Sequence, residues 1–139
     1  MNQQTSKYLM LIRPRSFSSN EETLVSNDFQ NQFEDTSSLA SIRAEVDLEF
    51  TNMISVLSDH KIDHVVFEDI EGLGSPDAIF PNNWVTFHDD GTVVLYPMMS
   101  RKRRKERRHD IIERLDSNGY SVDKIIDISS LENAEHYLE

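Results

Sequence analysis

The alternation of apolar and polar positions predicts a chain of strands and helices. Five consecutive apolar residues, Tyr8–Ile12, are typical of a buried strand. This strand should end at Pro14, because proline has no N–H to donate to a strand ladder. The stretch from 15 to 38 is polar and is predicted to be a long loop. Apolar residues then recur every three or four positions between 42 and 57, which predicts a helix, and Ile62–Phe67 is predicted to be another buried strand.

The second part of the chain predicts a hairpin, a helix and a strand. Trp84–His88 and Thr92–Tyr96 flank an Asp-Gly pair, a strong local signal for a β-hairpin. A helix is predicted from about Arg103 to Ser117, with Asn118-Gly119 as its C-terminal cap, and Tyr120–Ile128 should follow as a strand. This order indicates an α/β fold. A shift of 58 residues aligns apolar positions of the two helices, which indicates a repeated α/β unit.

Length and composition fit one small domain or a part of something larger. The chain has 139 residues, of which 37% are hydrophobic. No apolar run approaches the ~18 residues of a membrane span. The first residues are polar and lack the basic-then-apolar layout of a secretory signal. We therefore expect a cytoplasmic protein with no membrane partner.

Missing residue types exclude several kinds of chemistry. The sequence has no cysteine, which excludes a disulfide framework, a thiolate metal site and a cysteine nucleophile within these residues. The five histidines show no zinc-binding spacing, and the four glycines form neither a phosphate-binding loop nor a dinucleotide motif. The sequence predicts no metal and no cofactor.

Positive charge is concentrated in one short run. Arg101–Arg108 holds seven of the fourteen lysines and arginines, in a chain whose net charge is −11. Such a run suits phosphate backbones or an acidic partner. It has no aromatic residue to stack on bases, however, and on a helix its charges would face in every direction. We interpret it as a solvated helix start and expect no nucleic-acid partner.

The segment Ser75–His88 carries the densest set of polar functional groups. It combines two prolines, an aspartate, two asparagines and the only tryptophan. If Asn82 and Asn83 are buried, their amides must face hydrogen-bond partners or a ligand. The alternative is a structural turn ordered by Pro81. The residues alone favour the turn.

Three motifs together resemble one known family. They are Ile12-Arg13-Pro14, then Pro76-Asp-Ala-Ile-Phe-Pro-Asn-Asn-Trp84, then Val94-Leu-Tyr-Pro-Met98 with the basic run behind it. In this order they closely resemble the start of the citrulline hydrolases of citrulline utilisation. Those enzymes belong to the pentein superfamily, with arginine deiminases, dimethylarginine dimethylaminohydrolases and glycine amidinotransferases. The resemblance covers essentially all 139 residues.

The resemblance implies an incomplete α/β propeller. The family fold has five strand–helix modules around a substrate pocket. About two modules are expected here, near 8–83 and 84–139, in a single partial domain spanning 1–139. The nucleophilic cysteine and the catalytic histidine of the family belong to its second half, so this chain should hold no catalytic residue and be inactive alone.

The resemblance also implies a reaction of arginine metabolism. A cysteine thiolate would attack the ureido carbon of citrulline, and hydrolysis would give ornithine, ammonia and carbon dioxide. In the arginine-acting relatives an aspartate stands where this chain has Asn83. A carboxylate neutralises a guanidinium whereas an amide cannot, so Asn83 favours citrulline over arginine.

Three further residues are implied to take part in substrate binding. Asp77 and Glu139 would hold the nitrogen end of the substrate beside Asn83, although Asp77 is equally suited to bracing its own loop. Arg13 would either bind the substrate carboxylate or form a structural salt bridge.

Other interpretations stay open. One is an amidinotransferase or arginine deiminase relative. Another is a non-catalytic binding module that uses residues 101–108. Besides a small-molecule substrate, the expected partner is a second copy of the chain or a chain that completes the fold.

Overall fold

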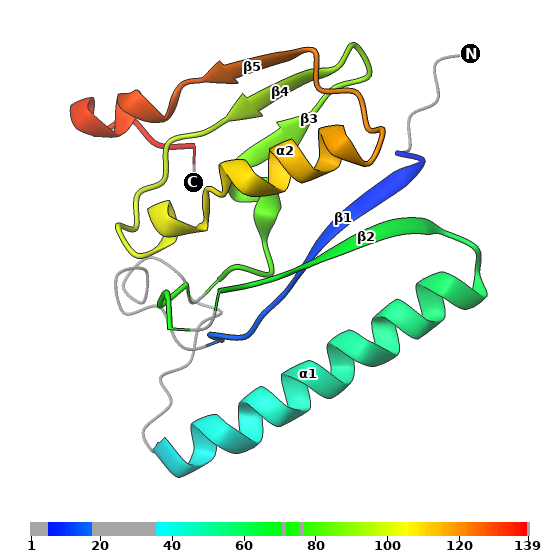
Figure 1. Cartoon of the computed structure of the whole chain (residues 1–139). Coiled ribbons are helices and arrows are strands. Elements are labelled where there is room, and N and C mark those ends of the chain that lie inside the picture. The colour runs from blue at the N-terminus through cyan, green and yellow to red at the C-terminus, as the bar shows by residue number, and fades with distance from the viewer. Residues whose placement is uncertain (1–5, 18–35, 71, 76, 139) are drawn as a thin grey trace. The chain divides into compact units, whose positions relative to one another are not determined.

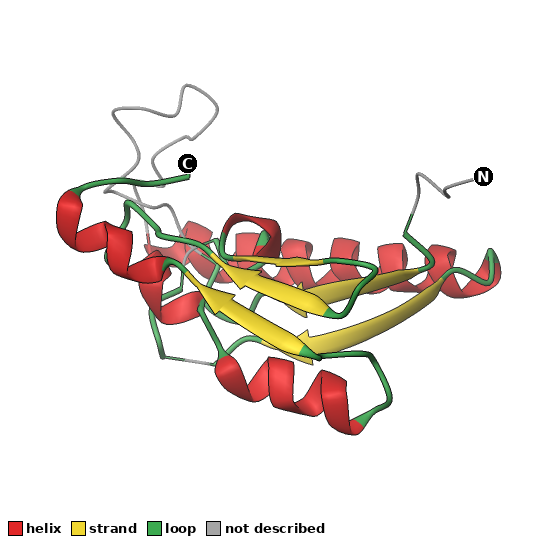
Figure 2. Cartoon of the chain, turned by 90° about the horizontal axis from the view of Figure 1, so that it is seen from above, coloured by secondary structure: helices red, strands yellow, loops and turns green. Residues whose placement is uncertain are grey.

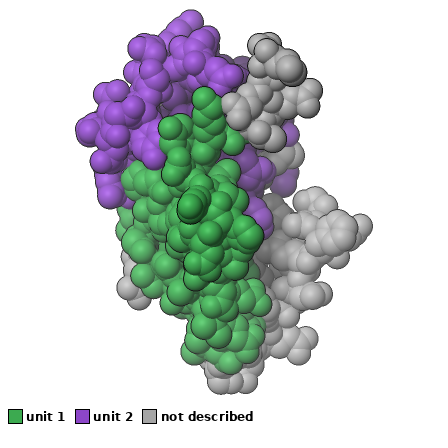
Figure 3. Space-filling view, turned by 90° about the vertical axis from the view of Figure 1, so that its right-hand side faces the viewer, with its two compact units in different colours: residues 1–79 green, residues 80–139 purple. Residues whose placement is uncertain are grey.

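Strands and helices alternate along the chain, in the mixed α/β order that the pattern of apolar positions predicts. The computed structural model describes residues 6–17, 36–70, 72–75 and 77–138 (Figure 1). The chain forms two compact units, residues 1–79 and 80–139, which are coloured separately in Figure 3. Each unit has its own small sheet, and loops connect most of the elements (Figure 2).

The first unit is a βαβ arrangement. Strands β1 (Tyr8–Arg13) and β2 (Asp63–Glu68) pair in parallel, with Ile12 opposite Phe67. Helix α1 (Thr36–Asp59) connects them and runs along the pair in Figure 1. A parallel pair needs such a crossover, because a tight turn would return the chain antiparallel. The side chains of Ile12, Phe50 and Phe67 are buried.

These elements confirm the predicted strands and helix of the first unit, with one difference. The long loop was expected to run to residue 38, but α1 begins at Thr36. Of the rest of that loop, residues 18–35 lie outside the described part of the chain.

The second unit contains the predicted hairpin and a further crossover. Strands β3 (Val85–Phe87) and β4 (Thr92–Leu95) pair antiparallel, which confirms the hairpin. Helix α2 (His109–Ser117) then leads to β5 (Lys124–Asp127), which pairs in parallel with β4. The sheet order is β3-β4-β5. Leu95 and Val93 of the central strand are buried.

The hairpin turn requires glycine at position 91. Gly91 has a φ of +74°, which favours glycine, and a Cβ there would lie 2.0 Å from Asp123 Oδ2. The carbonyl oxygen of Gly91 accepts a hydrogen bond from the Asp123 N–H at 2.9 Å. The close approach therefore fixes the turn against the segment that leads into β5.

The predicted helix from Arg103 to Ser117 is wrong in its first part. Arg103–Glu106 form a short 3₁₀ helix, η2, and α2 begins only at His109. Arg107 and Arg108 between them are extended, with ψ of 101° and 100°. Arginine and lysine are good helix formers, so local propensity favours a continuous helix. Ion pairs to residues elsewhere in this unit override that preference.

The βαβ arrangement recurs in both units, as the repeated apolar pattern indicated. Assembly of such arrangements into propeller modules near 8–83 and 84–139 stays a prediction. None of the helices in the described part of the chain is long and apolar enough to cross a membrane.

Candidate functional site

The segment singled out by its polar residues folds as a turn ahead of β3. Pro81–Asn83 form the 3₁₀ helix η1, with Pro81 in the first turn. The Asn83 N–H donates to Phe80 O at 3.2 Å, and the Trp84 N–H donates to Pro81 O at 3.0 Å. Trp84 is 1% exposed and anchors the turn. The backbone therefore follows the structural-turn alternative, which leaves the Asn83 side chain to be explained separately.

The Asn83 side chain is held by an arginine from the basic run. Its Oδ1 accepts a hydrogen bond from Arg103 Nη2 at 3.2 Å. Arg103 is 5% exposed, and its Nε donates to Glu106 Oε2 at 3.2 Å. Neighbouring Asn82 is exposed. Of the two asparagines, Asn83 is thus the one that takes part in a buried polar network.

Glu132 is the second organising residue of this unit. It lies in the 3₁₀ helix η3 (Ser129–Ala134), and its side chain is 9% exposed. Its carboxylate accepts the Met98 N–H at 2.8 Å and pairs with Arg104 Nε at 3.2 Å. Arg107 donates to both of its carboxylate oxygens. The carboxylate thereby ties η3 to the loop after β4 and to the basic run.

The expectation that the basic run is a solvated helix start is wrong. Arg103 is buried, and Arg104, Arg107 and Arg108 each pair with a carboxylate of the same unit. The guanidinium groups also donate to backbone, Arg104 to Met98 O at 2.9 Å and Arg107 to Tyr96 O at 3.3 Å. Glu132, the partner of Arg104 and Arg107, lies 25 positions or more away in the sequence, where a local charge pattern does not reveal it.

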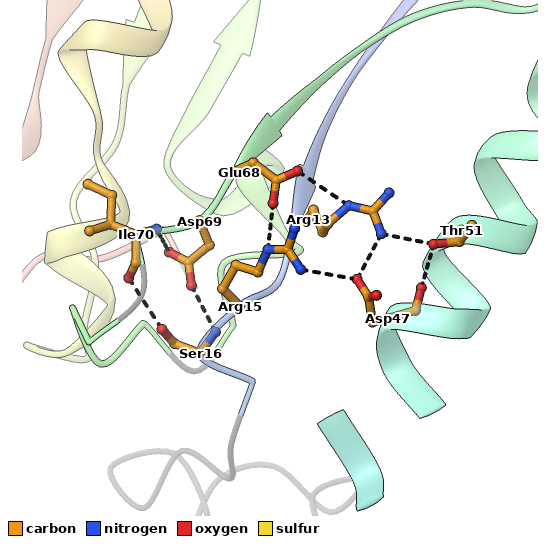
Figure 4. A network of polar contacts seen from close by, with 8 residues as sticks. All are labelled: Arg13, Arg15, Ser16, Asp47, Thr51, Glu68, Asp69 and Ile70. Atoms are coloured by element: carbon orange, nitrogen blue, oxygen red, sulfur yellow. Dashed lines mark hydrogen bonds and ion pairs between the residues drawn. The ribbon is translucent and has the colours of Figure 1, made fainter. Parts of the chain in front are cut away.

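Arg13 belongs to a polar network of the first unit (Figure 4). Its Nη1 donates to Asp47 Oδ1 at 2.8 Å and to Thr51 Oγ1 at 2.9 Å, and its Nε lies 3.4 Å from Glu68 Oε1. The guanidinium carbon also lies 4.7 Å from the centroid of the Phe50 ring. Arg15 pairs with the same two carboxylates. This geometry favours the structural salt bridge over the substrate carboxylate as the role of Arg13.

Asp77 and Glu139 are the remaining residues predicted to bind the substrate. Asp77 lies half-buried in the turn at residues 77–79 of the first unit, whereas Asn83 belongs to the second. Glu139 lies outside the described residues, although the Leu138 N–H before it donates to Pro97 O at 3.4 Å. The structure therefore describes Asp77 and Asn83 each within its own unit.

Three carboxyl groups of the second unit have lowered pKa values. Hydrogen bonds from Arg108 lower the pKa of Asp110, and hydrogen bonds from Ser129 lower that of Asp127. The backbone N–H of Thr92 lowers the pKa of Asp90 in the hairpin turn. Each of these carboxylates accepts hydrogen bonds at a turn or at the end of a helix or strand. Within the described residues, no three histidine or acidic side chains gather as a metal-binding group.

Comparison with known protein families identifies a match over most of the chain. A model of the protein family described as N,N dimethylarginine dimethylhydrolase, eukaryotic, matches residues 13–139. The matched span includes the turn at 77–83, the hairpin and the basic run. No curated protein and no solved structure matches the chain.

Proposed function

This chain belongs to the N,N-dimethylarginine dimethylhydrolase family, a branch of the pentein superfamily, and from that membership we propose that it carries substrate-binding residues of a guanidino- or ureido-group hydrolase. The family match is the observation that carries the proposal. Because the 139 residues contain no cysteine, the family's nucleophile must come from outside them. The binding residues proposed within the chain are Asp77, Asn83 and Glu139.

The preferred substrate in this proposal is citrulline. Its ureido group is neutral and offers an oxygen acceptor as well as N–H donors. Asn83 is a neutral amide, and it stands beside the positive charge of Arg103, at 3.2 Å. A cationic guanidinium placed at Asn83 would meet an amide that cannot neutralise it, beside an arginine whose charge Glu106 already compensates. Both features support a neutral group at this position.

The second candidate substrate is N,N-dimethylarginine, which the name of the matching family supports. Its guanidinium is cationic and needs a carboxylate partner. Asp77 is a half-buried carboxylate in the same segment, Ser75–His88. In this proposal Asp77 would meet the cationic group of N,N-dimethylarginine, whereas Asn83 would meet the neutral group of citrulline. Binding measurements on the two ligands separate these candidates.

The architecture proposed for the complete protein is a pentein propeller. The βαβ arrangement in each of the two units supports modules of this kind. A complementing chain or a second copy is the proposed partner, since the nucleophile and general acid of the reaction are to be supplied from elsewhere.

An NMR titration combined with a turnover assay tests the proposal. The ¹⁵N-labelled chain is titrated with citrulline, arginine and N,N-dimethylarginine, while ornithine, citrulline and ammonia are assayed. We expect citrulline to shift the signals of the Asn83 side chain and the Asp77 backbone, without turnover of any ligand. Asn83→Ala should abolish the shift of the Asp77 backbone signal, whereas Asn82→Ala, the exposed neighbour, should keep both shifts.

Two results would overturn the proposal. One is turnover by the purified chain that survives repurification, because no residue here can act as the family's nucleophile. The other is an absence of binding to all three ligands at concentrations that saturate known guanidino- and ureido-binding sites.

A further inference from the structure

Arg103 fixes the way in which the Asn83 amide faces its surroundings. We propose that Arg103 is a positioning residue, which turns the carboxamide of Asn83 so that its N–H donors face the substrate and select a ureido oxygen over a guanidinium. This inference rests on the proposed function and adds the residue that sets substrate preference.

The orientation of the amide follows from hydrogen-bond chemistry. A guanidinium has five N–H donors and no acceptor, so only the oxygen of an amide can face it. The 3.2 Å contact from Arg103 Nη2 to Asn83 Oδ1 therefore sets the rotation of the carboxamide. Within the described residues, Asn83 Nδ2 makes no hydrogen bond, which leaves its two N–H groups for a ligand.

Arg103 is itself rigidly held. Its side chain is 6% exposed, and the side chain of its ion-pair partner Glu106 is 1% exposed. The Arg103 N–H contacts Ser100 Oγ at 3.4 Å, which adds a backbone restraint at the start of η2. Side chains locked by such a supporting network hold a binding group in one geometry. The negative charge of Glu106 also compensates the buried guanidinium.

The other side of the contact is equally constrained. Asn83 lies at the end of η1, where Pro81 fixes the first turn and the buried Trp84 follows directly. The Asn83 side chain is therefore attached to a constrained backbone, and its oxygen accepts from a constrained donor, Arg103. Neither the backbone nor the carboxamide of Asn83 needs to become ordered when a ligand binds, so the Nδ2 N–H groups are preorganised.

This geometry distinguishes ligands by the hydrogen bonds that they can complete. A ureido oxygen accepts from Asn83 Nδ2. A guanidinium presents only N–H donors, so it cannot pair with Nδ2 and would have to share the Asn83 oxygen, which already accepts from the Arg103 guanidinium. Leaving a polar group without its partner in a binding site lowers affinity strongly.

The test measures the amide and the ligand preference in the same variants. Arg103→Met/Glu106→Gln removes the guanidinium without leaving a buried charge unpaired. We expect the Asn83 side-chain amide to become mobile by ¹⁵N relaxation. The ratio of dissociation constants for arginine and citrulline should fall about fivefold, the size of one net hydrogen bond. Arg101→Met, which replaces an exposed arginine of the same run, should preserve both the rigid amide and the ratio.

Each outcome is decisive. A rigid amide in the double variant, or an unchanged ratio while citrulline still binds, would overturn the positioning role and leave the proposed function standing. If the double variant does not fold, the wild-type chain decides: a mobile Asn83 amide, or citrulline that gives no nuclear Overhauser effect to its Nδ2 protons, would overturn the role. A wild-type chain that binds no ligand and yet has a rigid amide would overturn the proposed function together with the substrate preference, while retaining the Arg103–Asn83 contact.

Discussion

At the scale of single residues, Glu132 holds together the loop after β4, the basic run and η3. We expect Glu132→Gln to lower the free energy of unfolding by about 2 kcal/mol, because two partly buried arginines lose their counter-charge while the shape is kept. Urea denaturation measures this change. Hydrogen exchange should also show faster exchange of the Met98 amide, which donates to Glu132.

Glu135→Gln serves as the matched control, since Glu135 is exposed and lies three residues further along. It should change stability by a few tenths of a kcal/mol at most. Equal effects of the two variants would mean that the ion pairs of Glu132 contribute nothing measurable.

The candidate site shows what sequence can reveal at this scale. Asn83 stood out because the resemblance implies an aspartate at this position in arginine-acting relatives; its role in substrate binding stays a prediction. Its partner Arg103 lies 20 positions away in a run that resembles a solvated helix face, so nothing local reveals that it is buried. Glu132 was missed for the same reason. Long-range ion pairs leave no periodic pattern in a sequence.

At the scale of elements, α2 begins with an ion pair that makes its stability depend on pH. Asp110 accepts from Arg108 Nε at 3.0 Å and from Nη2 at 2.6 Å, which lowers the pKa of Asp110 below its ordinary value of 3.8. A lowered carboxyl pKa stabilises the fold above the ordinary pKa, and this stabilisation is lost as the pH falls through the folded-state value.

Asp110→Asn should therefore destabilise the protein at neutral pH but not in strong acid. Because Asp110 is half exposed, we expect a loss of only about 0.5 kcal/mol at pH 7. Thermal unfolding of both proteins from neutral to acid pH measures the difference, which should shrink below the ordinary pKa and vanish once the pH falls below the lowered folded-state pKa. Asp116→Asn, near the other end of α2, should not lower stability, since an acid there opposes the helix dipole. A difference that grows in acid would contradict the ion pair.

Elements were predictable where one local signal dominated. The Asp-Gly hairpin and the strand Tyr8–Arg13 follow from short patterns, and α1 follows from its apolar periodicity. The start of α2 was not predictable, because good helix formers at 103–108 are pulled into a 3₁₀ turn and an extended segment by tertiary ion pairs.

At the scale of the whole molecule, the uneven charge raises the question of nucleic-acid binding. The net charge is −11, and four arginines of the basic run pair with carboxylates. We expect no sub-micromolar binding to duplex DNA by fluorescence anisotropy. Tight binding with a salt slope of about −0.9 per neutralised phosphate would contradict this expectation. It would favour the binding-module interpretation if Arg101→Ser/Lys105→Ser, at exposed positions of the run, abolished it.

The most direct test of ureido selection is the ligand preference of Asn83→Asp. A carboxylate at position 83 would pair with Arg103 and so remain compatible with the fold, while it would also accept from a guanidinium. The dissociation constants of citrulline and arginine are measured for the wild type, Asn83→Asp and Asn82→Asp, which adds the same charge at the exposed neighbour. The preference for citrulline should fall about tenfold in Asn83→Asp, equivalent to about 1.4 kcal/mol, and stay unchanged in Asn82→Asp. An equal preference in all three proteins would contradict the assignment of Asn83 to the ureido end of the substrate.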